Sequence, residues 1–162
     1  MRTTVSTEIA MAEERHIPGI AEAWKEFMDF HRDIDPRFPM RENAQISFEK
    51  HLRDLMEAED TLILVALDES KAVGFSISQV RKYAPIWVER ETYGFIDTMA
   101  MTSDYRRKGI GEQMLGRIHE WFASRDIDMI ELSVSAKNQV GYSFWTKHGF
   151  RDHMHRLYLQ RD

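Results

Sequence analysis

The stretch FIDTMAMTSDYRRKGIGEQML, residues 95–115, decides the fold of this chain. It begins as an apolar run typical of a buried strand, passes through a polar, basic turn with two glycines, and continues with apolar residues at helical spacing. A strand, a tight loop and a helix are therefore predicted, in that order.

The predicted loop has the properties of an anion-binding site. Gly109 and Gly111 allow the backbone to approach a ligand closely, and the first N–H groups of the following helix have no intrahelical partner. Arg106, Arg107 and Lys108 add positive charge at the same place. We therefore expect the loop to bind a di-anionic group such as a pyrophosphate.

Two common nucleotide-binding motifs do not fit this loop. A P-loop continues with Lys and then Ser or Thr after its second glycine, whereas Glu112 follows Gly111 here. A dinucleotide-binding fingerprint needs a third glycine where this chain has Met114. A nucleotide-binding domain of another type is therefore disfavoured.

The loop sequence RRKGIG, residues 106–111, resembles the Gln/Arg-x-x-Gly-x-Gly/Ala signature of the GNAT superfamily of acyl-CoA-dependent N-acyltransferases. A second superfamily element follows at the expected distance and consists of Asn138, Gly141, Trp145, Gly149 and Phe150. The order and separation of the two elements make the resemblance more specific than either motif alone.

Composition restricts the remaining classes of protein. The 162 residues, 43% of them hydrophobic, suit one folded domain spanning residues 1–162. A formal charge of −5 argues against general nucleic-acid binding, and the absence of cysteine excludes disulfides, thiolate zinc sites and a cysteine nucleophile. No apolar run is long enough for a membrane span, and residues 1–6 lack the apolar region of a secretory signal. We expect a cytoplasmic protein without a nucleic-acid or membrane partner.

Hydrophobic periodicity predicts the other elements. They are a strand at 7–12, a helix from Pro18 that ends before Asp35, a second apolar helical stripe at 48–56, a hairpin of 61–67 and 72–78, a loop at 80–91, a helix from Ile110 to Phe122, a strand at 129–134, a helix at 138–148 and a last strand at 151–160. This order predicts a mixed α/β domain. The resemblance implies a GNAT-like, mostly antiparallel sheet of about six to seven strands, with splayed central strands and about four flanking helices.

The resemblance also implies acetyl-CoA as co-substrate. The backbone of Met99, Ala100 and Met101 would pair with its pantetheine arm as another strand would. Its pyrophosphate would lie on the loop that comprises Arg106, Arg107, Lys108, Gly109, Ile110 and Gly111. Asn138 would hydrogen-bond the pantetheine while it caps its helix, and Trp145 would flank the thiol end.

Attack of an amine on the thioester requires the amine to lose a proton, because an aliphatic amine with a pKa of about 10 is charged at neutral pH. Superfamily enzymes often place the base at one of two strand positions, which correspond here to Phe95 and Asp97. Only Asp97 can accept a proton. Many members carry a Tyr as the acid where this chain has Trp145, whose indole does not release a proton near neutral pH. Tyr142, on the same helical side, is the candidate acid, and a mechanism without an acid is left open.

The loop at 80–91 carries the candidate acceptor-binding residues Tyr83, Trp87, Glu89 and Glu91. Aromatic rings and carboxylates suit a cationic, partly apolar amine, although a solvated loop explains them equally well. His153 and His155 would share a strand face, but no carboxylate pattern accompanies them, so no metal is expected.

The sequence thus predicts an N-acetyltransferase in which a primary amine of a small molecule, peptide or protein attacks acetyl-CoA directly in a ternary complex. The alternative is a regulatory module that binds acyl-CoA without catalysis, which Trp145 at the usual Tyr position favours. A homodimer is left open.

Overall fold

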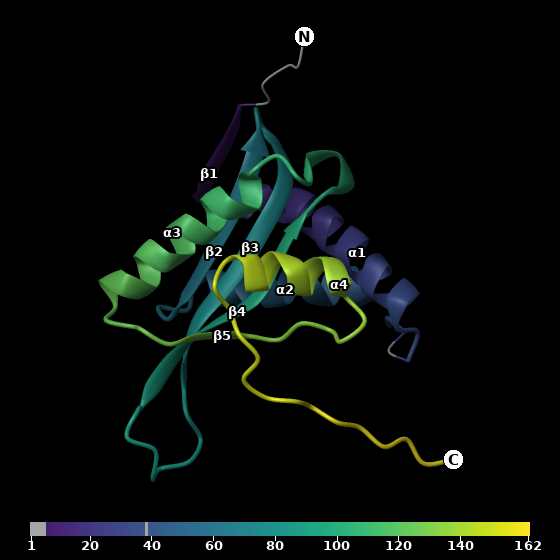
Figure 1. Ribbon diagram of the computed structural model, residues 1–162. Coiled ribbons are helices and arrows are strands. Elements are labelled where there is room, and N and C mark those ends of the chain that lie inside the picture. Colours follow the sequence, from purple (N-terminus) through teal and green to yellow (C-terminus); the bar gives the residue numbers. More distant parts are fainter. Residues whose placement is uncertain (1–5, 38) are drawn as a thin grey trace.

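A computed structural model describes residues 6–37 and 39–162, in which helices cover both faces of a single sheet (Figure 1). The strands are β1 (Thr7–Met11), β2 (Thr61–Asp68), β3 (Lys71–Lys82), β4 (Thr92–Met101) and β5 (Ile130–Leu132). The helices are α1 (Ile17–Ile34), α2 (Ala44–Met56), α3 (Ile110–Ser124) and α4 (Gln139–Lys147), with short 3-10 turns η1 (Glu14–His16) and η2 (Ser103–Tyr105). The prediction that residues 1–6 hold no signal sequence falls, except for Ser6, outside the described residues.

The sheet has the strand order β1-β2-β3-β4-β5. The first four strands are antiparallel to their neighbours, and β5 runs parallel to β4. The predicted mixed, mostly antiparallel architecture with four helices is therefore confirmed, and the hairpin at 61–78 forms as expected.

Two hydrophobic cores lie on the two faces of the sheet. Successive side chains of a strand point to opposite faces, and β2 is buried from Leu62 to Leu67 because it serves both cores. Its residues Ile63, Val65 and Leu67 pack toward α1 and α2, and its residues Leu62, Leu64 and Ala66 pack toward α3. Figure 1 shows α3 and α4 in front of the sheet and α1 and α2 behind it.

The first helix has the boundaries that its prolines predict. Pro18 occupies the first turn of α1, where its missing N–H costs nothing. The helix ends at Ile34 because Asp35 precedes Pro36 and is pushed into an extended conformation, with φ −146°.

A bulge interrupts β4 at Asp97. Thr98 lies opposite Ile77 and Ile96 lies opposite Ser78, so Asp97 has no partner in β3. The pairing of β4 with β5 covers only the three residues from Gly94 to Ile96. The two strands therefore separate at Asp97, as the resemblance implies, and the rest of β4 has no partner strand on that side within the described residues.

The predicted last strand at 151–160 is wrong. These residues have no regular structure and all are exposed, so the described sheet has five strands instead of six or seven. A strand requires a neighbour for its backbone groups, and no backbone hydrogen bond joins residues 151–162 to the described residues. Two smaller differences are that β3 continues to Lys82, which shortens the predicted loop to 83–91, and that β5 is shorter than the predicted strand at 129–134.

Candidate active site

The loop before α3 presents a row of backbone N–H groups that have no acceptor among the described residues. Arg107 and Gly109 adopt left-handed conformations, with φ 60° and 80°. The N–H of Gln113 donates to the Gly109 carbonyl at 3.2 Å, and for the N–H groups from Arg107 to Glu112 no described residue provides an acceptor. A Cβ placed on Gly109 would meet no heavy atom within 4 Å, so the loop opens to solvent. Such a turn at a helix N-terminus suits an anion.

The three cations of the loop have different environments. Arg106 donates from Nε to the Met101 carbonyl at 3.1 Å and lies 3.4 Å from Oε1 of Glu26. Glu26 Oε1 also accepts a hydrogen bond from the Ser103 N–H at 2.8 Å, so Arg106 ties the loop to α1. Arg107 and Lys108 are exposed and form no ion pair with the described residues. Their charges are therefore available to an anion.

Helix α4 is attached to the start of α3. Lys147 and His148 lie 3.4 Å and 3.2 Å from Oε1 of Glu112, and the hydrogen bond from Lys147 lowers the pKa of this carboxyl group. The negative charge of Glu112, next to the loop of residues 106–111, is thus offset by Lys147. Gly111 faces Phe144 of α4, since a Cβ there would lie 3.4 Å from the ring.

Asn138 caps α4 as predicted. Its Oδ1 accepts the Gly141 N–H at 2.9 Å. A Cβ on Gly141 would come within 2.5 Å of Asn138 Nδ2, which explains the glycine at this position. No described residue accepts a hydrogen bond from Nδ2, so the cap leaves this donor for a ligand.

Asp97 lies at the point where β4 and β5 separate. Its Oδ1 is 3.4 Å from Nη2 of Arg81, and Thr98 Oγ1 donates to its Oδ2 at 3.1 Å. The Arg81 guanidinium also lies 3.8 Å above the Phe95 ring, so Asp97 and Phe95 face the same side, as predicted. The Asp97 side chain is 43% exposed, which makes it a hydrated, ion-paired carboxylate.

Glu131 is a second carboxylate beside this separation, and the sequence analysis missed its role. It lies opposite Phe95 in the register of β4 and β5, and only 20% of its side chain is exposed. Its Oε2 accepts a hydrogen bond from the Tyr83 hydroxyl at 2.6 Å, and His153 Nε2 lies 3.3 Å from Oε1. Glu131 is the only ionisable residue in the run MIELSV, residues 129–134, so the argument that selected Asp97 applies to it equally.

Of the four predicted acceptor-binding residues, only Tyr83 reaches this region. Its ring stacks on Tyr93 with centroids 4.3 Å apart. Burial, followed by the hydrogen bond to Glu131, raises the pKa of Tyr83 to about 12. Trp87, Glu89 and Glu91 are exposed on the loop.

Trp145 and Tyr142 differ in their surroundings. Trp145 is half-buried, with its ring edge-on to Phe144 and Phe150 at centroid distances of 5.0 Å and 5.2 Å. Tyr142 is exposed and donates its hydroxyl hydrogen to Oδ1 of Asp152 at 3.0 Å, and this bond raises the pKa of the phenol. Trp145 therefore shapes the packing under α4, whereas Tyr142 carries a hydroxyl at the surface.

The side chains of the predicted cofactor-binding strand point into the cores. Ala100 is buried toward α1 and α2, and Ile110 is buried under α3, where Met99 and Met101 also pack. These four residues can therefore contact a cofactor mainly through their backbone.

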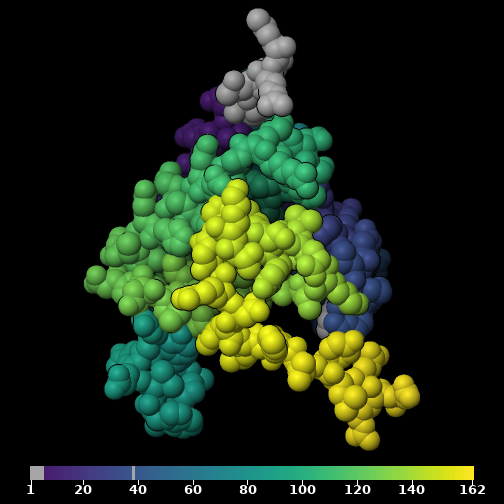
Figure 2. Space-filling model, in the orientation of Figure 1, coloured from purple at the N-terminus to yellow at the C-terminus, as the bar shows by residue number. Residues whose placement is uncertain are grey.

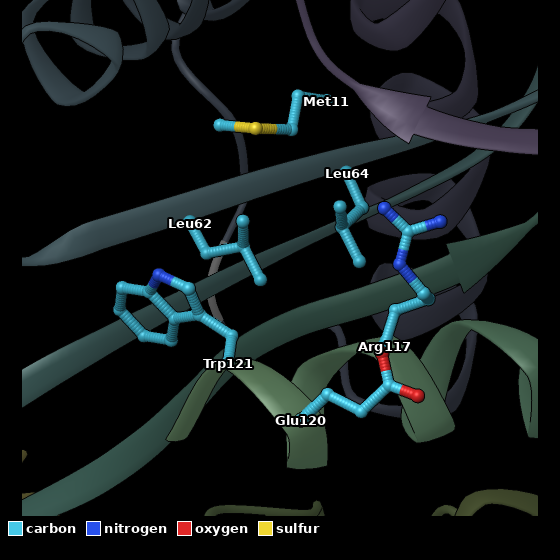
Figure 3. Close-up of a pocket in the computed structure, with 6 residues that line it drawn as sticks. All are labelled: Met11, Leu62, Leu64, Arg117, Glu120 and Trp121. Atoms are coloured by element: carbon cyan, nitrogen blue, oxygen red, sulfur yellow. The ribbon is translucent and has the colours of Figure 1, made fainter. Parts of the chain in front are cut away.

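Two cavities lie near β1, at the edge of the sheet opposite to β5. The first has a volume of about 260 Å³ and is lined by Met11, Leu62, Leu64, Arg117, Glu120 and Trp121 (Figure 3). The second, of about 320 Å³, is lined by Ile9, Gln113, Gly116, Arg117 and Glu120. Both lie between β1 and α3, far along the strand order from β5, and neither contains a predicted site residue.

Within the part of the chain that the structure covers, no group of three or more His, Cys, Asp or Glu side chains could hold a metal ion. None of the described helices is long and apolar enough to cross a membrane.

Residues 20–150 match the family model described as the acetyltransferase (GNAT) family. The chain belongs to this family. The matched region includes the anion loop, the separation of β4 and β5, and α4. No curated protein matches the sequence.

Solved structures share the fold of this GNAT protein at low sequence identity. A mutant BH1408 protein from Bacillus halodurans has a TM-score of 0.85 at 18% identity, with 95% of this chain and 99% of that chain covered. A predicted acetyltransferase with acetyl-CoA from Clostridium acetobutylicum has a TM-score of 0.77 at 18% identity, covering 96% of each chain. The aminoglycoside antibiotic 6'-N-acetyltransferase AAC(6')-IG from Acinetobacter haemolyticus has a TM-score of 0.76 at 14% identity, covering 96% and 98%.

Proposed function

We propose that this protein transfers an acetyl group from acetyl-CoA to a primary amine of a small molecule by direct attack in a ternary complex. The observation that carries the proposal is the continuity between two features of the site. The half of β4 without a β5 partner begins at Asp97 and leads directly into the loop whose N–H groups have no acceptor in the part of the chain that the structure describes. An extended arm that ends in a pyrophosphate would fit along this strand edge, and its negative charge would be complementary to the N–H groups and cations of the loop.

The two features would bind different parts of acetyl-CoA. The pyrophosphate would lie on the N–H groups from Arg107 to Gly111, with Arg107 and Lys108 supplying charge. The pantetheine arm would pair with the unpartnered edge of β4 at Met99 and Met101, as in strand addition. Asn138 Nδ2 would donate to the arm near its thiol end.

The chemistry would take place where the strands separate. The amine nitrogen attacks the thioester carbon, the carbon–sulfur bond breaks, and CoA leaves as a thiolate. Asp97 would receive the amine proton through a water molecule, because its carboxylate is hydrated and held by Arg81. A thiol with a pKa of about 8.5 is an adequate leaving group, so Tyr142 would assist departure without being essential.

The acceptor amine would bind on the α1 and α2 side of the separation. Glu131 offers a largely buried carboxylate, and the stacked rings of Tyr83 and Tyr93 lie beside it. A carboxylate with aromatic rings suits an ammonium group. The structural similarity to aminoglycoside 6'-N-acetyltransferases supports a small-molecule amine over a protein. The cysteine-free sequence suits the reducing cytoplasm, where we propose that the protein acts.

Calorimetric titration with CoA, ATP and NAD tests the cofactor. CoA is expected to bind, and the other two are not, because the loop lacks the P-loop and dinucleotide patterns. Binding of ATP or NAD in preference to CoA would contradict the proposal. The regulatory alternative predicts CoA binding without turnover, so measurement of acetyl-CoA turnover with a panel of amines distinguishes the two functions.

A further inference from the structure

The two cavities beside β1 adjoin each other and form one groove along α3. Both are lined by Arg117 and Glu120, and their volumes are about 260 Å³ and 320 Å³. Figure 2 shows β1, in purple, at the surface next to the green residues of α3. These volumes lie near the lower limit of about 300 Å³ for pockets that bind small molecules, so a ligand of this groove has to be small.

The first cavity of the groove has apolar walls. Leu62 and Leu64 of β2 are buried beneath it, and the Met11 side chain is 63% exposed at its rim. The Trp121 ring is held in place by Arg125, whose guanidinium lies 4.6 Å from the ring centroid. Figure 3 shows Met11 and Trp121 with Leu62 between them. This part of the groove suits a short apolar group of a ligand.

Two opposite charges lie beside these apolar walls. Arg117 and Glu120 are three residues apart on α3, a spacing at which Cβ atoms are about 5–6 Å apart. Arg117 donates from Nη1 to the Ile9 carbonyl at 3.1 Å, which holds the guanidinium against β1. Glu120 forms no hydrogen bond or ion pair with any residue that the structure describes. The groove therefore presents a cation and an anion that do not neutralise each other.

A ligand with a single charge fits this pair of side chains poorly. A carboxylate next to Arg117 would be repelled by the Glu120 carboxylate, and an amine next to Glu120 would be repelled by the guanidinium. A zwitterion matches both charges. An α-amino acid carries its ammonium and carboxylate groups on one carbon atom, so two oppositely charged side chains on neighbouring turns of a helix can bind both.

We propose that the groove between β1 and α3 binds a free α-amino acid with an apolar side chain, such as leucine. The carboxylate of the ligand contacts Arg117, and its ammonium group contacts Glu120. Its side chain packs on Leu62, Leu64 and Trp121. The site lies at the β1 edge of the sheet, whereas the proposed acceptor region lies at the β5 edge. Ligand binding here is separate from acetyl transfer and does not depend on the proposed function.

The indole N–H signals of the four tryptophans in a nitrogen–proton NMR spectrum report on the groove separately from the active site. Trp121→Phe assigns the Trp121 signal by its loss. Titration of the protein with L-leucine, without acetyl-CoA, should move this signal and leave that of Trp87, which is 83% exposed on the loop after β3. Isoamylamine lacks the carboxylate and isocaproate lacks the ammonium group. Each should bind about tenfold more weakly than leucine, because it loses one charged hydrogen bond.

The variant Glu120→Gln tests the role of each charge. The Glu120 side chain has no hydrogen-bond or ion-pair partner among the described residues, so the circular dichroism spectrum should not change. The variant should weaken leucine binding about tenfold and remove the advantage of leucine over isocaproate, while leucine still binds more tightly than isoamylamine. Glu131→Gln is the matched control, since it removes a carboxylate at the other edge of the sheet and should leave leucine binding unchanged.

Several results would overturn the proposal. A Trp121 signal that does not move at millimolar leucine would exclude the site. Equal affinities for leucine and both analogues, or full leucine affinity in Glu120→Gln, would show that the charges do not select the ligand. A Trp121 signal that moves with protein concentration in the absence of leucine would show that a second copy of the chain covers the groove.

Discussion

The Asp97 carboxylate lies 3.4 Å from the Arg81 guanidinium, at the bulge where β4 loses its pairing with β5. Asp97 has no cross-strand partner at this bulge, and its side chain faces the same side of β4 as Phe95, where Arg81 contacts both. The ion pair holds the carboxylate in this position while water still reaches it. A proton relay through water fits this arrangement better than direct abstraction by a buried base.

Asp97→Asn should lower kcat by about 10²- to 10⁴-fold, the usual range for a positioned base, with CoA affinity nearly unchanged. The loss should shrink as the pH approaches the pKa of the amine, because free amine is then abundant. Arg81→Gln is the matched control, since it removes the same ion pair and keeps the carboxylate. Equal losses in both variants would show that the ion pair matters for structure and that Asp97 is not the base.

Gly109→Ala should weaken CoA binding. The left-handed φ of 80° costs a residue with a Cβ about 1–2 kcal/mol, and relief of that strain would turn the loop N–H groups away from the pyrophosphate. Gly116→Ala is the control, because a Cβ there also meets no atom within 4 Å but the residue lies inside α3. It should increase stability by roughly 0.5–1 kcal/mol without altering CoA affinity. Equal calorimetric affinities for both variants would remove the loop from the cofactor site.

The fold was largely predictable from local sequence patterns, because the elements concerned have short-range signals. Pro18 and Pro36 mark the limits of α1, and the glycines and basic residues at 106–111 mark the turn into α3. The final segment, residues 151–160, was predicted as a strand from its local sequence pattern. Strand formation depends on a neighbouring strand, and a local sequence pattern does not say whether the chain itself provides one.

Site residues could be predicted where they belong to a short sequence motif, and not where they join the site through contacts between distant parts of the chain. Asp97, Gly109 and Asn138 could be selected from the sequence, and they lie where β4 and β5 separate, at the start of α3 and at the start of α4. Glu26 could not be found this way, because it contacts Ser103 and Arg106 across 77 and 80 residues of chain. Glu131 could have been found, since it is a carboxylate in an apolar strand.

Tyr83 should ionise later than an ordinary tyrosine in a spectrophotometric titration. Its pKa is raised from 10.0 to about 12, mainly by burial and further by the bond to Glu131. A raised pKa means that this phenol adds stability below pH 10, and that this contribution is lost as the pH rises from 10 to about 12. Tyr83→Phe should remove the transition near pH 12, and Glu131→Gln should shift it only part of the way to 10.0 because burial persists. A titration without a transition near pH 12 would contradict the proposed contact.

Trp145→Phe should keep most of the catalytic rate and lower the melting temperature. The indole packs edge-on to Phe144 and Phe150, and an aromatic pair of this kind contributes about 0.5–1.5 kcal/mol beyond its buried area. Tyr142→Phe removes a surface hydroxyl and should change stability less, with a larger loss of rate if that hydroxyl assists the thiolate. Loss of turnover in Trp145→Phe, with folding and CoA binding intact, would show that the indole takes part in the reaction.

Turnover of acetyl-CoA with a panel of primary amines tests the central claim most directly. The protein has no cysteine, so any free thiol that a colorimetric reagent detects comes from released CoA. We predict that at least one small-molecule amine gives thiol release that matches the acetylated amine measured by mass spectrometry, mole for mole, and that no acetylated protein accumulates. Tight CoA binding with no thiol release for any amine across pH 6 to about 10, the range up to the amine pKa, would contradict the account and favour the regulatory module.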